Sequence, residues 1–204
     1  MFDCIDINKQ LAFDHPLLKD HKIQVDGYQK TGCFNMMCPG FVQVNQKVTP
    51  GSVLAPLSTF RGDQYFINLL IFRDPESGNW WLTYGSDTNG TRIGYWPGSL
   101  FKSLASQASQ VVWGGSASSP ANEPSPPMGS GHQPFEGGDT DVEAGAIVKD
   151  IQLVSDKLRY YEPRQDDQSK TEPRKDCYQV TNGWNDNDHL GFKFYFGGRG
   201  GCTS

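Results

Sequence analysis

The chain has 204 residues, of which 36% are hydrophobic and 12% aromatic, with 23 glycines and 13 prolines. This composition favours many turns over long helices and allows a core rich in aromatic rings. The formal net charge is −5 and no basic stripe occurs, which argues against a nucleic-acid partner. No apolar run approaches the length of a membrane span, so no membrane association is expected.

The predicted strands begin after a polar, irregular stretch at residues 1–26. β-Branched and aromatic runs then end in Gly, Pro, Asp or Asn, a pattern typical of short strands. They cover residues 41–48, 65–72, 79–85, 93–96, 110–113, 144–155, 158–162, 177–180 and 190–198. The continuous apolar half of 65–72 predicts burial on both faces, whereas the alternation in 190–198 predicts a half-buried strand.

Other segments predict connections. DPESGN at 74–79 has turn chemistry and predicts a hairpin. In residues 96–109, Leu100, Leu104 and Ala108 follow helical spacing after Pro97, which predicts one short covering helix. The Pro/Gly/Ser-rich loop at residues 116–142 is expected to lack regular structure. The fold class is therefore antiparallel all-β, most similar to a sandwich.

Five cysteines bear on the compartment. Cys33 and Cys38 bracket a short loop, Cys177 and Cys202 bracket the last segment, and Cys4 is left over. Disulfides are favoured over zinc because neither close C-x-x-C pairs nor nearby histidines occur, and disulfides indicate an oxidising compartment. Asn89-Gly-Thr matches a glycosylation acceptor. The opening MFDCIDINKQ, however, lacks the pattern of a signal peptide.

No catalytic motif stands out among the nucleophiles and acids. Ser116 in WGGSAS lacks both the G-x-S-x-G pattern and an identifiable histidine, and the glycine-rich segments lack the context of a phosphate loop. Cys33 is a poor candidate nucleophile because it would be oxidised to a disulfide with Cys38. The histidines are His15, His21, His132 and His189, all interpreted as surface residues. The acids near glycines or aromatic residues are Glu136, Asp139, Asp141 and Glu143, in or beside the flexible loop. No metal or cofactor is expected.

Tryptophans are the remaining candidates for a binding surface. Trp80, Trp96 and Trp113 lie on predicted strands or at their ends. Exposed, they could stack proline or sugar rings; buried, they would belong to the core, and the core interpretation is favoured for each alone. Trp80 and Trp81 must point to opposite faces of one strand.

Several motifs in consistent order resemble the neprosin family of plant secreted glutamic peptidases, which cleave at proline. They are DGYQKTGCFNMMCPGFVQ, GNWWLTYG, GYWPGSLF, VVWGG, MGSGH, KDIQLV, CYQV and FYFGGRGGC. This resemblance covers residues 26–204, and residues 1–25 separately resemble part of the family's activation propeptide. It implies a double-sheet β-sandwich, disulfides Cys33–Cys38 and Cys177–Cys202, an extracellular or vacuolar location, and two catalytic glutamates working at acidic pH.

Two departures from the family pattern decide the functional prediction. Gln24 is followed almost at once by Asp26-Gly27-Tyr28, so the stretch that carries the first catalytic glutamate is missing. The second glutamate belongs after the glycines of WGG, where this chain has Ser116. The sandwich would then be incomplete, with exposed edges. We therefore expect a poorly stable monomer or one stabilised by a partner, with an incomplete gene model as a third possibility.

The sequence therefore predicts a truncated, inactive neprosin-type peptidase whose only substrate class would be proline-containing peptide or protein. One alternative is a binding module in which Trp80, Trp96 and Trp113 hold proline-rich peptide or cell-wall glycan without cutting. Another is residual hydrolysis by Glu136 or Glu143 folded over the sheet.

Overall fold

The structure, a computed structural model of the chain, describes residues 40–85, 90–102, 104–117, 119–136, 144–172 and 174–203. The predictions for Cys4, Cys33, Cys38, Asn89, Glu143 and the boundary after residue 25 lie outside these residues. The described elements are antiparallel strands and two single-turn 3-10 helices, which confirms the all-β prediction. Within these residues no helix has the length and apolar character needed to span a bilayer.

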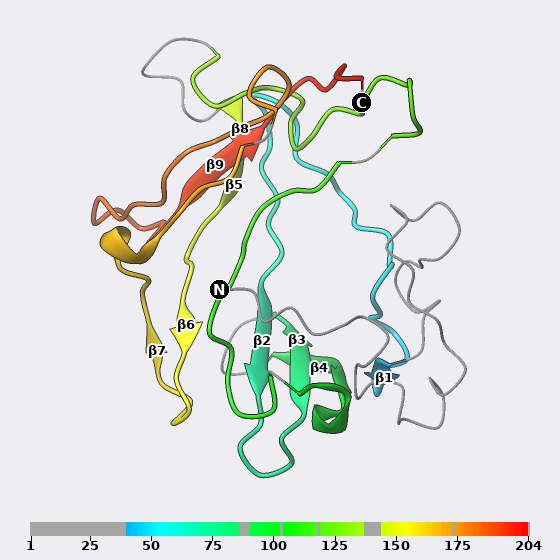
Figure 1. Ribbon diagram of the computed structural model, residues 1–204, viewed down its shortest axis with the longest axis vertical. Helices are drawn as coiled ribbons and strands as arrows, with labels where there is room; N and C mark the ends of the chain where they lie inside the picture. Colours follow the sequence, from blue (N-terminus) through cyan, green and yellow to red (C-terminus); the bar gives the residue numbers. More distant parts are fainter. Residues whose placement is uncertain are drawn as a thin grey trace. The chain divides into compact units, whose positions relative to one another are not determined.

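The chain divides into two compact units. Of the described residues, the first contains those up to Ala55 and those within Phe66–Gln110, and the second contains those within Pro56–Tyr65 and those after Gln110 (Figure 1). Each unit has its own sheet.

The first unit contains a four-stranded antiparallel sheet in the order β1-β4-β3-β2. Its strands are β1 (Val42–Gln43), β2 (Leu69–Arg73), β3 (Trp80–Tyr84) and β4 (Thr91–Trp96) (Figure 1). A tight turn joins β2 to β3. In it the Gly78 N–H donates to the Asp74 carbonyl over 2.8 Å, and the Ser77 N–H donates to the Asp74 carboxylate over 3.1 Å. The hairpin predicted at 74–79 is confirmed.

Both faces of this sheet carry aromatic side chains. Trp80 lies opposite Trp96 in the register of β3 and β4, and Trp81 lies opposite Tyr95, with ring centroids 4.8 Å apart. Because successive residues of a strand point to opposite faces, the two neighbouring tryptophans lie on different sides of the sheet. The Arg92 guanidinium lies 4.6 Å from the centroid of the Trp81 ring and covers that side.

The second unit contains a three-stranded antiparallel sheet in the order β5-β9-β8 and a separate two-stranded ribbon. The strands are β5 (Ala146–Val148), β8 (Gln179–Val180) and β9 (Phe194–Gly197) in the sheet, and β6 (Leu153–Val154) and β7 (Tyr160–Tyr161) in the ribbon. Buried Ile151, Phe192 and Phe194 form the core of this unit. The burial of these apolar side chains is the main stabilising contribution here.

The half-buried pattern predicted for residues 190–198 is wrong, because β9 is the central strand and both of its faces are covered. Lys193 and Tyr195, predicted to face solvent, are buried. The Lys193 ammonium pairs with the carboxylates of Asp186 and Asp188, and Trp184 packs on the Tyr195 ring with centroids 5.7 Å apart. The paired charges allow a lysine to be buried.

The long loop lies against this second sheet. No strand or helix occurs in the part that the structure describes, residues 116–136 without 118, as predicted. The Met128 N–H nevertheless donates to the Gly198 carbonyl over 2.9 Å, and the Ser125 N–H donates to the Cys202 carbonyl over 2.8 Å. The loop is thus fixed by backbone hydrogen bonds to the C-terminal segment.

Three local predictions are wrong. The helix expected over residues 96–109 is reduced, in the described residues, to the 3-10 turn Gly98–Leu100 (η3), and the Leu104 carbonyl accepts a 3.0 Å hydrogen bond from the Trp80 indole instead of a helical N–H. The run at 110–113 forms no strand, because it connects the two units and joins neither sheet. The run at 65–72 is not buried on both faces: β2 is an edge strand with Leu69 and Ile71 exposed.

Candidate functional site

The corner after residues 110–113 consists of Gly114, Gly115 and Ser116. A Cβ atom at Gly115 would lie 2.4 Å from Sδ of Met128 and 3.0 Å from Cε2 of Phe196. Glycine at this position therefore lets the backbone pack directly against the loop and β9. Ser116 follows at once and is exposed, so the corner presents a hydroxyl group to solvent.

The Glu136 carboxylate, a candidate acid, is held by several donors. Its Oε2 accepts a 3.1 Å hydrogen bond from the Gln133 N–H and lies 3.1 Å from Nδ1 of His132, and Arg199 pairs with Oε1. The Phe60 ring stacks on the imidazole with centroids 3.8 Å apart. These contacts fix the turn at 133–136 and leave Glu136 little freedom to approach a substrate.

A hollow of about 500 Å³ lies in the second unit, a volume typical of small-molecule pockets. Its lining includes Phe135 from the turn at 133–136 and Trp184. It also includes three charged residues from the segment before β8, namely Lys170, Glu172 and Lys175. Aromatic rings, two ammonium groups and one carboxylate thus meet at one concavity.

Glu172 is the acid of this hollow, and its side chain is only 7% exposed. Oε1 accepts a 2.8 Å hydrogen bond from the Val180 N–H, and Oε2 lies 3.4 Å from Nζ of Lys170 and 3.6 Å from Nζ of Lys175. Desolvation alone would raise the pKa of this carboxyl. The Val180 hydrogen bond and the two ammonium groups outweigh it, so the pKa of Glu172 is lowered and the group stays ionised.

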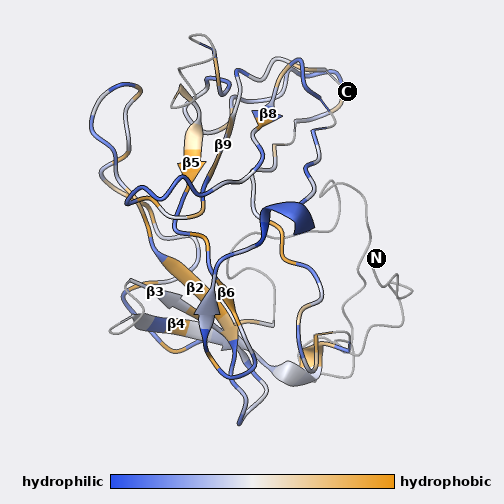
Figure 2. Cartoon of the chain, turned by 90° about the vertical axis from the view of Figure 1, so that its left-hand side faces the viewer, coloured by the Kyte–Doolittle hydropathy of each residue, from blue (hydrophilic) through white to orange (hydrophobic). Residues whose placement is uncertain are grey.

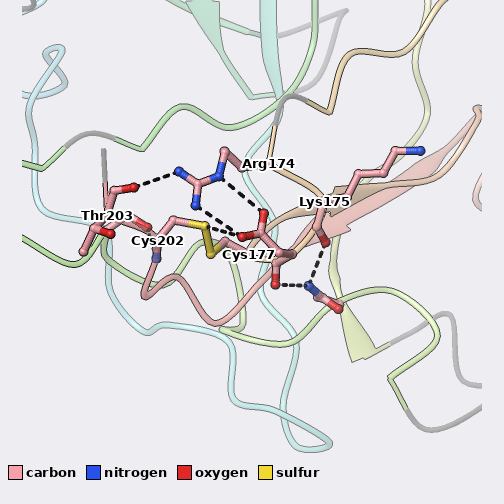
Figure 3. Close-up of polar contacts among 8 residues, drawn as sticks. Arg174, Lys175, Cys177, Cys202 and Thr203 are labelled. Atoms are coloured by element: carbon pink, nitrogen blue, oxygen red, sulfur yellow. Dashed lines mark hydrogen bonds and ion pairs between the residues drawn. A yellow bond between two sulfur atoms is a disulfide. The ribbon is translucent and has the colours of Figure 1, made fainter.

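Beside the hollow, the Cys177–Cys202 disulfide joins the last segment of the chain to the segment before β8, with Cα atoms 6.0 Å apart (Figure 3). Arg174 spans this bridge, donating to the Thr203 carbonyl over 3.0 Å and pairing with the Asp176 carboxylate over 3.2 Å. Its hydrogen bonds lower the pKa of Asp176. Asp176 and the two sulfur atoms lie close enough to hold a metal ion, but disulfide-bonded sulfurs are not thiolate ligands.

The Cys177–Cys202 disulfide and the all-β fold agree with what the resemblance of the motifs implies. A family model described as Neprosin matches residues 5–199. The chain belongs to the neprosin family. The match extends over nearly the whole chain and begins within the segment that resembles a propeptide.

In this neprosin-family chain the three tryptophans divide between the two units. Trp80 and Trp96 lie together on β3 and β4 of the first unit; the Trp80 indole donates to Leu104, and Phe41 contacts Trp96 edge-on at 4.7 Å. Trp113 belongs to the second unit and is 39% exposed. The structure thus brings two of the three predicted ring platforms together.

The sequence alone did not predict the pocket around Glu172. Its only visible signal is the charged run KTEPRK at 170–175, which is equally typical of a solvated surface. Phe135, an exposed aromatic residue in the left-handed region with φ 65°, leaves no trace in the sequence. His189, the other described histidine, is exposed, as predicted.

Proposed function

We propose that this neprosin-family chain is a catalytically inactive relative of the proline-cleaving glutamic peptidases. The resemblance assigns catalysis to two glutamates, of which one falls in the stretch absent after Gln24 and the other is replaced by Ser116. The observation that carries the proposal is the exposed serine of the corner. A serine hydroxyl cannot replace a carboxyl group as general acid or base at the acidic pH where such an enzyme works.

The charged neighbours of two described carboxylates, Glu136 and Glu172, support the same conclusion. A mechanism with two carboxyl groups requires one to carry a proton while the other accepts one. Glu136 is paired with Arg199, and Glu172 is kept ionised by Lys170 and Lys175. The lowered pKa of Glu172 therefore disfavours the protonated form that a general acid needs to donate a proton during peptide hydrolysis.

The test is incubation of the protein with a proline-containing peptide at acidic pH, with the products followed by mass spectrometry. We expect no cleavage by the natural sequence. Ser116→Glu should also be inactive, because a single carboxyl group cannot divide the acid and base roles. A clear gain of activity in Ser116→Glu would contradict the absence of the first glutamate.

Residual hydrolysis by another acid has a separate signature. Cleavage by the natural sequence that is abolished in Glu136→Gln, Glu143→Gln or Glu172→Gln would overturn the proposed inactivity. Glu123→Gln, which replaces an exposed glutamate elsewhere in the loop, is the matched control and should leave any such activity unchanged.

A second candidate function is binding of proline-rich peptide without cleavage, favoured by the exposure of Trp113 and by the Trp80–Trp96 pair. Saturable binding, followed by tryptophan fluorescence and lost in Trp113→Ala or Trp96→Ala, would support it. Retention of full binding in both variants would exclude both Trp113 and the Trp80–Trp96 pair as binding sites.

The predicted compartment and the predicted deletion after Gln24 are separate parts of this proposal. The Cys177–Cys202 disulfide supports an oxidising compartment, such as the extracellular space or vacuole implied by the resemblance. Sequencing the transcript across residues 22–27 tests the deletion. A longer transcript would restore the stretch expected to carry the first glutamate and would still encode Ser116.

A further inference from the structure

The hollow around Glu172 is preformed, because hydrogen bonds tie its three walls together. The Gln133 side-chain amide donates to the Lys175 and Asp176 carbonyls over 3.4 and 3.3 Å, joining the turn at 133–136 to the charged segment. The Lys170 ammonium donates to the Val180 carbonyl over 3.2 Å, joining that segment to β8. A ligand would therefore find its contacts already in position.

The charges in the hollow are not balanced. Lys170 and Lys175 both lie within 3.6 Å of the same oxygen of Glu172, so two positive charges share one negative charge. No other acid lines the hollow among the described residues. Asp176, next to Lys175 in the chain, is paired with Arg174. Both lysines reach solvent, so an anionic group could approach their remaining N–H donors and complete the neutralisation.

The apolar part of the lining consists of the rings of Pro134, Phe135 and Trp184 together with Val180. Trp184 packs at a tilt on Tyr195, has the Lys193 ammonium 5.7 Å from its ring centroid, and also lines the hollow. Phe135 is exposed, and its φ of 65° is a conformation that bulky residues rarely adopt. Such conformations persist where the surrounding structure imposes them and are concentrated at ligand sites. Here the Glu136 contacts hold the turn that directs this ring to the hollow.

We propose that this hollow binds a carboxylated sugar, such as one uronic-acid unit of an acidic oligosaccharide. The ring's C–H face would stack on Trp184 or Phe135, and its carboxylate would pair with Lys175 and Lys170. The Glu172 carboxylate and the side-chain amides of Gln179 and Asn182 in the lining supply acceptors and donors for hydroxyl groups. A mixture of donors and acceptors beside an unbalanced positive charge suits such a ligand better than a purely apolar one. This site shares no residue with the corner at Ser116.

The test is a titration of the full chain with trigalacturonate, followed by tryptophan fluorescence and isothermal calorimetry. Its fully methyl-esterified form is the matched neutral ligand, because it keeps the rings and removes the charge. We expect saturable binding of the acid that weakens with salt, and binding of the ester that is at least about tenfold weaker.

Two variants locate the site. Lys175→Gln removes one ammonium group and leaves Lys170 on Glu172, and Phe135→Asn removes the ring while supplying a residue that tolerates a positive φ. Each should weaken binding at least about fivefold. Lys157→Gln, an exposed lysine in the turn between β6 and β7, is the control and should bind as the natural protein does. Thermal unfolding of each variant establishes that it is folded.

Several results would overturn the proposal. They are no binding of trigalacturonate by the folded natural protein, equal binding of acid and ester, or equal loss in Lys175→Gln and Lys157→Gln. The protein could instead bind a peptide that ends in proline, in a Lys175-dependent manner, and not bind trigalacturonate. That result would assign the hollow to a peptide carboxylate and refute the proposed sugar ligand.

Discussion

The edge strand β2 of the first unit and the central strand β9 of the second unit bury their side chains to very different extents. In the four-stranded sheet of the first unit, Ile71 on the edge strand β2 is 55% exposed. Figure 2 shows that β2 is largely hydrophobic in sequence, in orange. In the three-stranded sheet of the second unit, Phe194 on the central strand β9 is 7% exposed. Both residues are large and apolar and both lie in short antiparallel strands, so the difference comes from what covers the strand.

The second sheet is covered by segments that contain little regular structure of their own. The loop at 119–136 is hydrogen-bonded at Met128 and Ser125 to the segment that follows β9, and the Cys177–Cys202 bridge fixes that segment. The β2 edge has its backbone groups paired with β3 on one side only. Strand position and loop cover, more than residue type, decide which apolar residues of this chain form a core.

The largest expected effect is the loss of the Phe194 ring. Phe194→Ala should lower the free energy of unfolding by about 3–5 kcal/mol, because it leaves a cavity between Ile151 and Phe192. Ile71→Ala should cost about 1 kcal/mol or less, since much of that side chain is already in water. Urea unfolding of both variants measures the difference. Equal losses of unfolding free energy in the two variants would show that β2 is covered in solution and would remove the contrast between β2 and β9.

The next largest effect concerns the Cys177–Cys202 disulfide, which anchors the C-terminal segment to which the loop at 119–136 is hydrogen-bonded. Replacing both Cys177 and Cys202 by alanine releases a loop with a sequence separation of 25 residues and should cost about 3 kcal/mol. Cys4→Ala, the cysteine without a predicted partner, is the control and should leave the urea midpoint unchanged. A double variant as stable as the natural protein would mean that hydrogen bonds alone hold the loop.

The sequence was informative where local chemistry decides the structure. The hairpin at 74–79 follows from Asp74, Ser77 and Gly78, and the separation of Trp80 from Trp81 follows from strand geometry. The edge position of β2 and the burial of β9 depend on partners far away in the chain. An apolar run such as 65–72 looks the same whether or not a second layer covers it.

The candidate sites divide in the same way. Ser116 could be singled out from the sequence because the residues of WGGS are contiguous and the resemblance to the family depends on them. The pocket around Glu172 combines a turn near Phe135, the segment at 170–175 and Trp184, and only folding brings them together. A run containing lysines and one glutamate predicts a solvated surface until the burial of Glu172 is known.

The smallest expected effect is a change in pH dependence at the covered face of β9. The hydrogen bond that the Lys193 ammonium donates to the Asp186 carboxylate lowers the pKa of Asp186. Burial would lower the pKa of Lys193, but Asp186 and Asp188 raise it overall. A lowered carboxyl pKa adds stability above the unfolded value of about 3.9 and loses it as the pH falls through the lower folded value. A raised lysine pKa adds stability below about 10.4 and loses it as the pH rises through the folded value.

Lys193→Met removes both contributions and keeps a long apolar side chain against Trp184. Near neutral pH we expect a change of about 1 kcal/mol or less, because an apolar replacement for a buried ion pair is often nearly neutral. The loss of stability between about pH 5 and pH 2 should become shallower than in the natural protein, because Asp186 would return toward its ordinary pKa. Urea midpoints across this range measure the slope. An unchanged slope would show that the ion pair does not contribute to the acid sensitivity of the second unit, and that apolar packing of Phe194 and Tyr195 alone distinguishes β9 from β2.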